Sequence, residues 1–403
     1  MNRHLEDGVG SRARFTATVS LAELSRDPYP IYKALRSLQP VAWIPELDSW
    51  IVTRYHDVRA VLLDSVTFVT GTPRSLIYQT FGEQMLTVEG DLHRRYRDSQ
   101  IQAAFMPKGV RDAFEGTIAR RVNDLLDGFI DLGTADIRTA LAARLPVLVM
   151  LDVFGLPQTD EVCFRRWYDS FEASLANHAR DPAVFAEAAS NVREFHEYFQ
   201  RRIEEHRVRP GTSFLDGLLA RPETGRLTDE ELRRNALIIF FGGISTVEAL
   251  ILNTLWALLT HPREIARIVA DRGLLDRALD ETMRWVSPVQ SAMRHPLRDC
   301  VLAGVSIPAG ATVNCMLGSA NRDETVFVEP DTFLLDRGNV QQHLGFATGP
   351  HACLGRNLAK AEARAAIGTL LDRMSKIEIV EATEPAGHEF RQPRALMLRW
   401  RAV

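Results

Sequence analysis

Residues 343–360 read HLGFATGPHACLGRNLAK, and this stretch decides the fold because it delivers one cysteine, Cys353, to the start of a helix. The loop before Cys353 is crowded with glycine and proline, which suit a tight backbone and the close approach of another group. From Arg356 onward, apolar side chains recur at helical spacing in an alanine-rich run. Backbone N–H groups and the positive end of the helix dipole would then point at Cys353, so we expect thiolate to be favoured over thiol.

The composition is that of one large folded unit. The chain has 403 residues, of which 46% are hydrophobic, enough to bury a large core. Glycine and proline are scattered, and no linker, low-complexity tract, repeat or block of like charge divides the sequence. We therefore expect a single domain over residues 1–403, helical except for strand-rich parts near residues 40–65 and 295–320.

Net charge and cysteine content limit which binding partners and which cellular compartment we expect for this protein. The formal net charge is −4 and the pI is near 6.3, which gives no electrostatic reason to expect nucleic acid. The first residues are polar and lack the apolar core of a signal peptide or membrane anchor, so we expect a soluble, cytoplasmic protein. The four cysteines are far apart with no Cys-x-x-Cys pair, which argues against a disulfide framework and a structural zinc site built on cysteines.

Hydrophobic periodicity predicts a mostly α-helical protein with small sheets. Helical spacing dominates residues 110–206 and recurs in residues 263–285. Residues 67–89 follow no regular pattern but mix apolar residues with glycine and proline, so we expect an ordered lid or pocket wall there. Alternation predicts short strands at residues 41–44, 49–53, 301–313 (paired strands around 308–310), 377–380 and 395–400.

A second stretch, residues 228–259, predicts a long helix through the centre of the molecule. Thr228 and Glu231 form a capping box, and the helix that follows is apolar on nearly every side. Polar residues in its middle argue against a membrane span, where lipid would penalise them. Gly242 and Gly243 remove two side chains there, so a flat or bulky group can approach the backbone.

Two pairs of polar residues stand at helical spacing. His93 and Arg97 are four residues apart and could together hold an anionic group, although an ordinary solvated helix face is the alternative. Glu281 and Arg284 are three residues apart and can form an ion pair.

Together these residues resemble one family, the cytochromes P450, which are haem-thiolate enzymes, in their soluble bacterial form. The resemblance covers nearly the whole chain and is most specific around the cysteine, with Phe346 seven residues before Cys353 and Gly355 two after it. Gly349 and His351 also occupy the family's positions. The resemblance implies that Cys353 ligates the iron of haem b, which would lie between the central helix and the cysteine loop.

The resemblance also implies roles outside the cysteine loop. Glu281 and Arg284 match the family's Glu-x-x-Arg pair, which would form a structural network with Arg337. Four cationic or imidazole side chains would bind the haem propionates: His93, Arg97, Arg294 and His351. For His93 and Arg97 this role replaces the interpretation of a solvated helix face.

Two positions depart from the family's pattern. Ala347 stands where the family usually has the first glycine of the loop, so the backbone there must avoid positive φ or adopt it at a cost. We expect a modest distortion with haem retained. Ser245 replaces the acid that precedes Thr246, the family's oxygen-facing threonine. We hypothesise that Glu248 acts with water in place of this acid, and packing of Glu248 against a neighbouring helix is an equal alternative.

The implied reaction is hydroxylation or epoxidation, with O2, of an apolar small organic molecule such as a secondary metabolite, terpenoid, steroid or fatty-acid-like compound. Electrons would come from a separate ferredoxin or flavodoxin with its reductase, because no such domain fits in the remaining sequence. We expect a monomer with no nucleic-acid or membrane partner. The substrate pocket is expected to include Ile239, Phe241, Val289, Gln290, Tyr78, Phe81 and Phe171.

Basic residues recur every four positions after the cysteine, at Arg356, Lys360 and Arg364. They predict a docking stripe for an acidic electron donor, although a solvated helix face explains them equally well. The serine at position 245 keeps two other functions open, peroxide-driven oxygenation and a non-oxygenating haem-thiolate reaction. A haem sensor or carrier without turnover is a further alternative.

Overall fold

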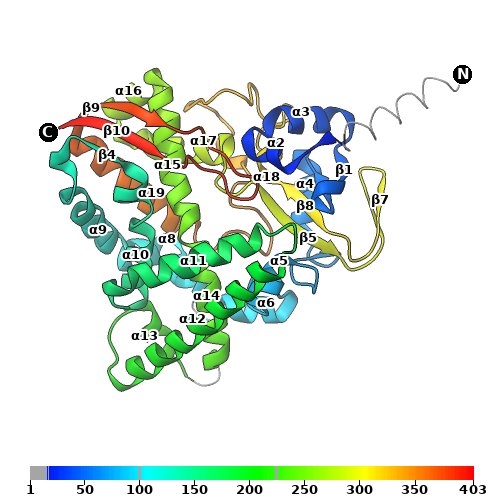
Figure 1. Ribbon diagram of the computed structural model, residues 1–403, viewed down its shortest axis with the longest axis horizontal. Helices are drawn as coiled ribbons and strands as arrows, with labels where there is room; N and C mark the ends of the chain where they lie inside the picture. The colour runs from blue at the N-terminus through cyan, green and yellow to red at the C-terminus, as the bar shows by residue number, and fades with distance from the viewer. Residues whose placement is uncertain (1–15, 17, 99–100, 223–225) are drawn as a thin grey trace, which may run out of the picture.

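The computed structural model describes residues 16, 18–98, 101–222 and 226–403. Within these residues the chain is mostly helical with three small sheets (Figure 1), as the periodicity predicted. The helices are α2 (Leu21–Arg26), α3 (Tyr29–Leu38), α4 (Tyr55–Leu63), α5 (Leu76–Phe81), α6 (Gly90–Asp98), α7 (Ile101–Phe105), α8 (Pro107–Ala113), α9 (Glu115–Asp127), α10 (Leu145–Phe154), α11 (Glu161–Leu175), α12 (Pro182–Val208), α13 (Phe214–Leu219), α14 (Asp229–Gly242), α15 (Ser245–Thr260), α16 (Pro262–Ala270), α17 (Leu275–Trp285), α18 (Leu317–Ala320) and α19 (Arg356–Arg373). The strands are β1 (Val41–Ile44), β2 (Ser49–Val52), β3 (Phe68–Val69), β4 (Thr134–Asp136), β5 (Ser291–Pro296), β6 (Cys300–Leu302), β7 (Val305–Ile307), β8 (Val313–Met316), β9 (Met374–Ala382) and β10 (Leu396–Ala402).

The largest sheet joins the two strand-rich parts of the chain. Its order is β1-β2-β8-β5-β3, with β2 and β8 parallel and the other pairs antiparallel. A second sheet, β4-β10-β9, lies on the opposite side of the molecule from β1 in Figure 1.

The third sheet is the hairpin of β6 and β7, which turns at Ala303 and Gly304. These two residues adopt φ of 48° and 80°, as the tight two-residue turn of a hairpin requires. The prediction of strands paired around residues 308–310 was therefore wrong. Those residues form a separate turn, in which the Ala311 N–H donates to the Pro308 carbonyl oxygen at 3.2 Å.

Residues 67–89 contain more regular structure than the sequence predicted. Residues 68–69 form β3, which pairs with β5, and α5 begins after Ser75, whose hydroxyl accepts a hydrogen bond from the Tyr78 N–H. The prediction of an irregular segment failed here because six residues are too few to show helical periodicity. The segment packs against α11, α12 and α14 through α5.

The long central helix begins as the capping box predicted. The Thr228 hydroxyl accepts from the Glu231 N–H, and the Glu231 carboxylate accepts from the Thr228 N–H. The helix is interrupted at Gly243 and Ile244, which separate α14 from α15. In the described part of the chain, Asp229–Thr260 has the length and apolarity of a membrane span, but 83% of its most apolar window is buried inside the protein. It is a core helix, in contact with α10, α17 and α19.

A buried ion-pair network ties α17 to the segment that leads into the cysteine loop. Arg284 donates to both carboxylate oxygens of Glu281 at 2.8 Å, and Arg337 Nε donates to the same two oxygens at 3.1 Å. The remaining guanidinium N–H groups donate to backbone carbonyls of residue 321 and of residues 328–332. All three charges therefore have partners, as a buried network requires.

Candidate active site

The cysteine loop closes on itself before α19 begins. The Cys353 N–H donates to the Phe346 carbonyl oxygen at 2.9 Å, and Gly355 is the N-cap residue of α19. Gly349 adopts φ of 79°, and a Cβ there would lie 2.5 Å from the Leu62 carbonyl oxygen. This position therefore requires glycine. α19 packs against α15, the second half of the central helix.

Cys353 retains accessible surface although protein atoms enclose it on most sides. Burial raises the pKa of its thiol, whereas the Gly355 and Arg356 N–H groups and the charges of Arg97 and Arg356 act in the opposite direction. Burial has the larger effect. The prediction that the helix start alone favours the thiolate was therefore wrong, and a cation bound to the sulfur is needed to hold it deprotonated.

The two glycines of the central helix have different surroundings. A Cβ on Gly242 would meet nothing within 4 Å, so Gly242 borders open space. A Cβ on Gly243 would lie 3.3 Å from Met150 Sδ, so this glycine permits close packing of α10. Thr246, one turn after Gly242, donates its hydroxyl to the Gly242 carbonyl oxygen at 2.7 Å. The threonine oxygen is thus held at the edge of the space that Gly242 leaves.

Four cationic or imidazole side chains cluster near the cysteine loop. Arg97 donates to the carbonyl oxygens of residues 350 and 352 at 3.2 and 2.8 Å. The rings of His93 and His351 lie 4.4 Å apart, and His93 Nε2 and His351 Nδ1 are buried with no hydrogen-bond partner among the described residues. Arg294 is only 5% exposed and donates to the Met293 carbonyl oxygen. An anion would satisfy these groups.

Glu89 also belongs to this cluster, and sequence reasoning missed it. Its carboxylate lies 2.7 Å from His351 Nε2 and accepts from the Thr70 N–H at 3.0 Å. Burial would raise the pKa of Glu89, but His351 and Thr70 outweigh it and hold the pKa below its usual range. Because 262 residues separate Glu89 from His351, no local pattern could reveal the pair. His351 keeps only Nδ1 for a further ligand.

Ser245 is hydrogen-bonded across helices. Its hydroxyl pairs with the hydroxyl of Tyr168 on α11, and both groups are buried. Glu172 lies one turn beyond Tyr168 on the same face of α11. Burial raises the pKa of Glu172, Tyr168 lowers it, and the charge of Glu248 raises it, with a net rise above the ordinary value. Neither Tyr168 nor Glu172 had a sequence signal that set it apart from ordinary helix residues.

Glu248 is buried, and both of its carboxylate oxygens have partners. It is 1% exposed, and its two oxygens accept from Arg138 Nε at 2.8 Å and from Arg165 Nη1 at 3.1 Å. Gln392 Nε2 lies 3.4 Å from one of them. Both carboxylate oxygens of Glu248 are therefore already engaged by neighbouring side chains. These contacts favour the packing interpretation of Glu248 over the relay hypothesis.

Three of the predicted pocket residues meet in one aromatic group. The ring of Phe81 lies 5.3 Å from that of Phe171 and 5.1 Å from that of Phe241. Sequence reasoning missed two further members: Tyr168 stacks on Phe241 at 5.3 Å, and the Phe390 ring lies 6.2 Å from Phe241. We call these five rings the aromatic wall.

The other predicted pocket residues occupy varied positions. Ile239 precedes the aromatic wall on α14 and is 9% exposed, and Val289 forms a β-bridge with Phe390. Tyr78 is 37% exposed on α5. Gln290 is fully buried, donates to the Ser287 carbonyl oxygen at 2.7 Å and fills the space beside residue 318. The exposure of Tyr78 and the packing of Gln290 against its neighbours favour structural roles for these two residues over substrate contact.

The basic stripe on α19 is largely neutralised. Lys360 Nζ lies 2.7 Å from Asp280 Oδ1, and Arg364 lies 2.9 Å from Asp276 Oδ1. Both acids belong to α17. Arg356 is exposed and forms no ion pair with any described residue. Of the three predicted docking residues, Arg356 therefore keeps its charge available.

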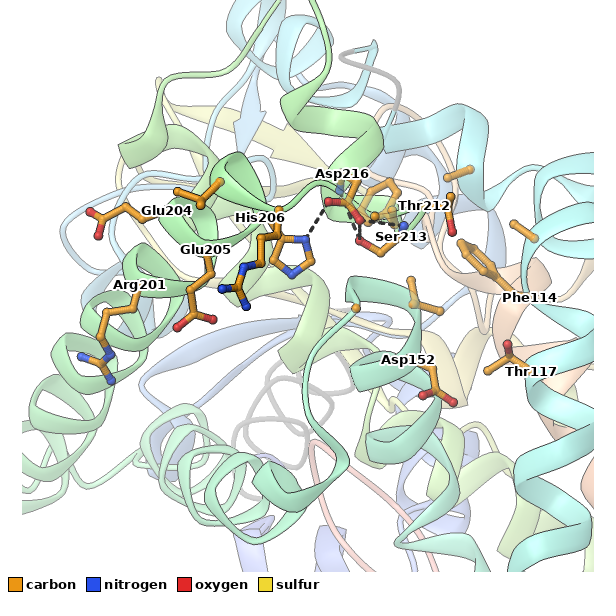
Figure 2. A pocket seen from close by; sticks show the side chains of 18 residues that line it. Phe114, Thr117, Asp152, Arg201, Glu204, Glu205, His206, Thr212, Ser213 and Asp216 are labelled. Carbon is orange, nitrogen blue, oxygen red and sulfur yellow. Dashed lines mark hydrogen bonds and ion pairs between the residues drawn. The ribbon is translucent and has the colours of Figure 1, made fainter.

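A large groove of about 1170 Å³ lies away from these residues, between α8, α9 and the ends of α10 and α12, beside α13 (Figure 2). His206 Nδ1 lies 2.8 Å from Asp216 Oδ1, and the Ser213 hydroxyl donates to Asp216 Oδ2 at 2.6 Å. Asp152 pairs with Arg121 at 2.7 Å. None of the predicted site residues lines the groove.

Known proteins share this arrangement. The family model described as Cytochrome P450 matches residues 165–391, which contain Cys353 and the Glu281–Arg337 network. The cytochrome P450 monooxygenase PikC of Streptomyces venezuelae is 34% identical over 402 residues, which cover 94% of this chain and 92% of PikC. The chain belongs to the cytochrome P450 family. As a P450, it is a monooxygenase that binds haem b through a cysteine thiolate.

Solved structures agree with the P450 fold over nearly the full chain. CYP109E1 from Bacillus megaterium, solved with testosterone, matches with a TM-score of 0.87 and 31% identity, covering 94% of this P450 and 99% of that chain. P450BioI, solved with an acyl carrier protein ligated to hexadec-9Z-enoic acid, matches with a TM-score of 0.86 and 29% identity, covering 94% and 100%.

Ala347 of this P450 adopts φ of 53°, the left-handed region that the sequence analysis expected to be costly. Such a conformation costs an alanine about 1–2 kcal/mol. We predict that Ala347→Gly raises the melting temperature of the holoprotein by roughly 1–3 °C, measured by circular dichroism. Ala352→Gly, at a neighbouring position without positive φ, is the control and should lower it. Equal losses in both variants would contradict strain at Ala347.

Proposed function

We propose that this P450 transfers one atom of O2 to an apolar small organic molecule, by hydroxylation or epoxidation, with Cys353 as the thiolate ligand of its haem. One observation carries the proposal: the accessible Cys353 precedes a helix packed along α15, next to the stretch where Gly242 and Thr246 border open space. A flat prosthetic group with a metal at its centre suits a site that has the Cys353 sulfur on one side and helix backbone without a side chain, at Gly242, on the other.

The residues present suit haem b. The buried Arg294 and the partly buried Arg97 supply cations for the two propionates. The unpartnered nitrogens of His93 and His351 supply hydrogen-bonding groups. Glu89 orients the His351 ring through Nε2. Once bound, the thiolate-ligated haem supplies the electron-rich iron at which the O–O bond is cleaved.

Proton supply is assigned to a path that starts at Glu172. The buried carboxyl holds a proton to higher pH than a surface glutamate, and the Tyr168 hydroxyl lies one turn before it on α11. Tyr168 passes a proton to the hydroxyl of Ser245, which adjoins Thr246. Ser245 thereby serves as a conduit, while the acid that the family places at this position is supplied from the neighbouring helix. This path replaces the hypothesis that used Glu248.

The aromatic wall favours an apolar substrate. Rings from α5, α11, α14 and the segment before β10 converge there, and the polar atoms of the wall are already paired at Tyr168. Similarity to CYP109E1, solved with testosterone, and to P450BioI, solved with a fatty-acyl carrier protein, supports a steroid or a fatty-acid-like compound within the proposed class of apolar substrates.

The proposed electron donor is a ferredoxin or flavodoxin that docks beside the start of α19. Arg356 is exposed there without an acidic partner in the described chain, and Lys108 and Met106 are exposed at the start of α8, which packs against α19. Positive charge around an exposed apolar side chain suits a small acidic protein. We propose that the protein works as a cytoplasmic monomer.

The reduced, CO-bound holoprotein is predicted to show the strongly red-shifted Soret band of thiolate-ligated haem. Cys353→His should retain haem but lose the shift, because imidazole donates less electron density to iron. Cys300→Ser, at the cysteine of β6, is the matched control and should keep the shift. Wild-type protein that binds haem without the shifted band would overturn the assignment of Cys353.

Proton supply is tested by the share of NADH-derived electrons released as hydrogen peroxide. In the wild type this share should rise as pH increases through the raised pKa of Glu172, because the proton-carrying form is lost. Glu172→Gln and Tyr168→Phe should release a high share at every pH.

Two further measurements separate this path from its rivals. Glu248→Gln should keep wild-type coupling even if it melts at a lower temperature. One infrared carboxylic-acid band of the wild type should disappear in Glu172→Gln, while the band of the buried Glu362, whose pKa is also raised, should remain. Poor coupling in Glu248→Gln alone would return the relay to Glu248. Turnover with peroxide but none with NADH and partners would support the peroxide-driven alternative.

Electron-donor docking is tested by reduction kinetics at low ionic strength. Arg356→Gln should slow reduction by a flavodoxin or ferredoxin roughly 3–10-fold and flatten its salt dependence, because an attractive charge is removed. Arg364→Gln is the matched control, since Asp276 already neutralises that residue, and it should change the rate little. Equal rates in wild type and Arg356→Gln, with unchanged CO spectra, would place docking elsewhere.

A further inference from the structure

Two histidines and a glutamate meet outside the aromatic wall, in a cluster that the proposed reaction does not use. His178 lies in the connection between α11 and α12, and His388 and Glu389 lie in the turn between β9 and β10. Glu389 Oε1 is 3.3 Å from His178 Nε2 and 3.6 Å from His388 Nε2. One ligand atom from each residue lies within 4.8 Å of the other two.

The polar atoms of this cluster are buried and unsatisfied. His178 Nε2, both ring nitrogens of His388, and Glu389 Oε1 have no well-aligned hydrogen-bond partner among the described residues. The His388 residue is only 5% exposed. Leaving such groups unpaired is costly, and each such site in a folded protein calls for a ligand.

Glu389 is prepared as an anionic ligand. Its other oxygen, Oε2, accepts from the Ser291 hydroxyl at 2.6 Å. Burial would raise the pKa of Glu389, but the two imidazoles and Ser291 hold the pKa at about 2. In the described part of the chain the two histidines are the ion-pair partners of Glu389, and no arginine or lysine forms an ion pair with it. Glu248 and Glu281, by contrast, are each neutralised by two arginines.

The backbone around the three residues is fixed. The Gln290 N–H donates to the Glu389 carbonyl oxygen at 2.9 Å, and the Gly387 N–H donates to the Ser25 carbonyl oxygen at 2.8 Å. On the other side, Asn177 Oδ1 accepts from the Asp181 N–H at 2.9 Å, which closes the turn that carries His178. Supporting contacts of this kind orient the ligands of metal sites.

We propose that His178, His388 and Glu389 bind one divalent transition-metal ion, with Zn²⁺ the preferred probe. Two imidazoles and a carboxylate are a common ligand set for zinc in proteins, with a fourth position open to water. Ligand atoms of a tetrahedral zinc site lie roughly 3.3 Å apart, so small side-chain rotations bring the present atoms into range. The bound ion would join the α11–α12 connection to the turn that carries Phe390 of the aromatic wall.

Untagged holoprotein provides the test. The protein is treated with EDTA, incubated with Zn²⁺ and separated from free metal by gel filtration. Elemental analysis should then find one more zinc ion per chain in the wild type than in the triple variant His178→Asn, His388→Asn, Glu389→Gln. Competition with a chromogenic chelator should show that each single variant binds Zn²⁺ at least roughly tenfold more weakly than the wild type. Loss of a contact that only supports a ligand already weakens metal binding by about that factor. His196→Asn, at a half-buried histidine of α12 outside the cluster, is the matched control and should bind as the wild type does.

Spectroscopy gives a readout that does not depend on turnover. X-ray absorption at the zinc edge should report two imidazole nitrogens and carboxylate oxygen. Zinc bound equally by wild type and triple variant, or no zinc retained by wild type, would overturn the proposal. Either result leaves the haem-thiolate function untouched, because the CO spectrum measures that function separately.

Discussion

The buried network of Glu281, Arg284 and Arg337 is the constraint on which the rest of the site depends. Removing one member of such a network leaves uncompensated charge in the interior, at a cost of about 3–5 kcal/mol. The two guanidinium groups also gather the carbonyls of residues 321 and 328–332, the segment that precedes the cysteine loop. Asn321 then accepts from the N–H of Leu344, at the entrance of that loop. The network thereby fixes where the loop begins, and the loop fixes Cys353.

Three glutamates that are buried or half-buried, Glu248, Glu172 and Glu389, show that the same chemical group takes different roles in different surroundings. Glu248 is held by Arg138 and Arg165 and serves as an anchor, whereas Glu172 has no arginine partner among the described residues and its pKa is raised. Glu389 has only imidazole and hydroxyl neighbours and stays anionic. The same side chain becomes a fixed anion, a proton carrier or a candidate ligand according to which partners the fold supplies.

The features that could be predicted from the sequence are those that depend on residues close together along the chain. The spacing around Cys353, the capping box at Thr228 and the open helix at Gly242 could be predicted, because loops, caps and helix surfaces are set within a few residues. Tyr168, Glu89 and the cluster around Glu389 could not, because their partners lie far away along the chain and only tertiary packing joins them. The pKa of Cys353 was misjudged for the same reason, since burial is a property of the whole fold.

α11 is held both in its first half and in its last turn. Arg165 and Tyr168 fasten its first half to Glu248 and Ser245 of α15. Its last residues lead into the connection that carries His178, where the contacts are with α5 and with the turn at Glu389. The hydroxyl of Ser174 in the last turn of α11 pairs with the hydroxyl of Thr80 on α5 at 2.7 Å, so a widening at that end would have to break this contact. Glu172 lies in this last turn and Tyr168 one turn before it, so such a movement would also displace the start of the proposed proton path.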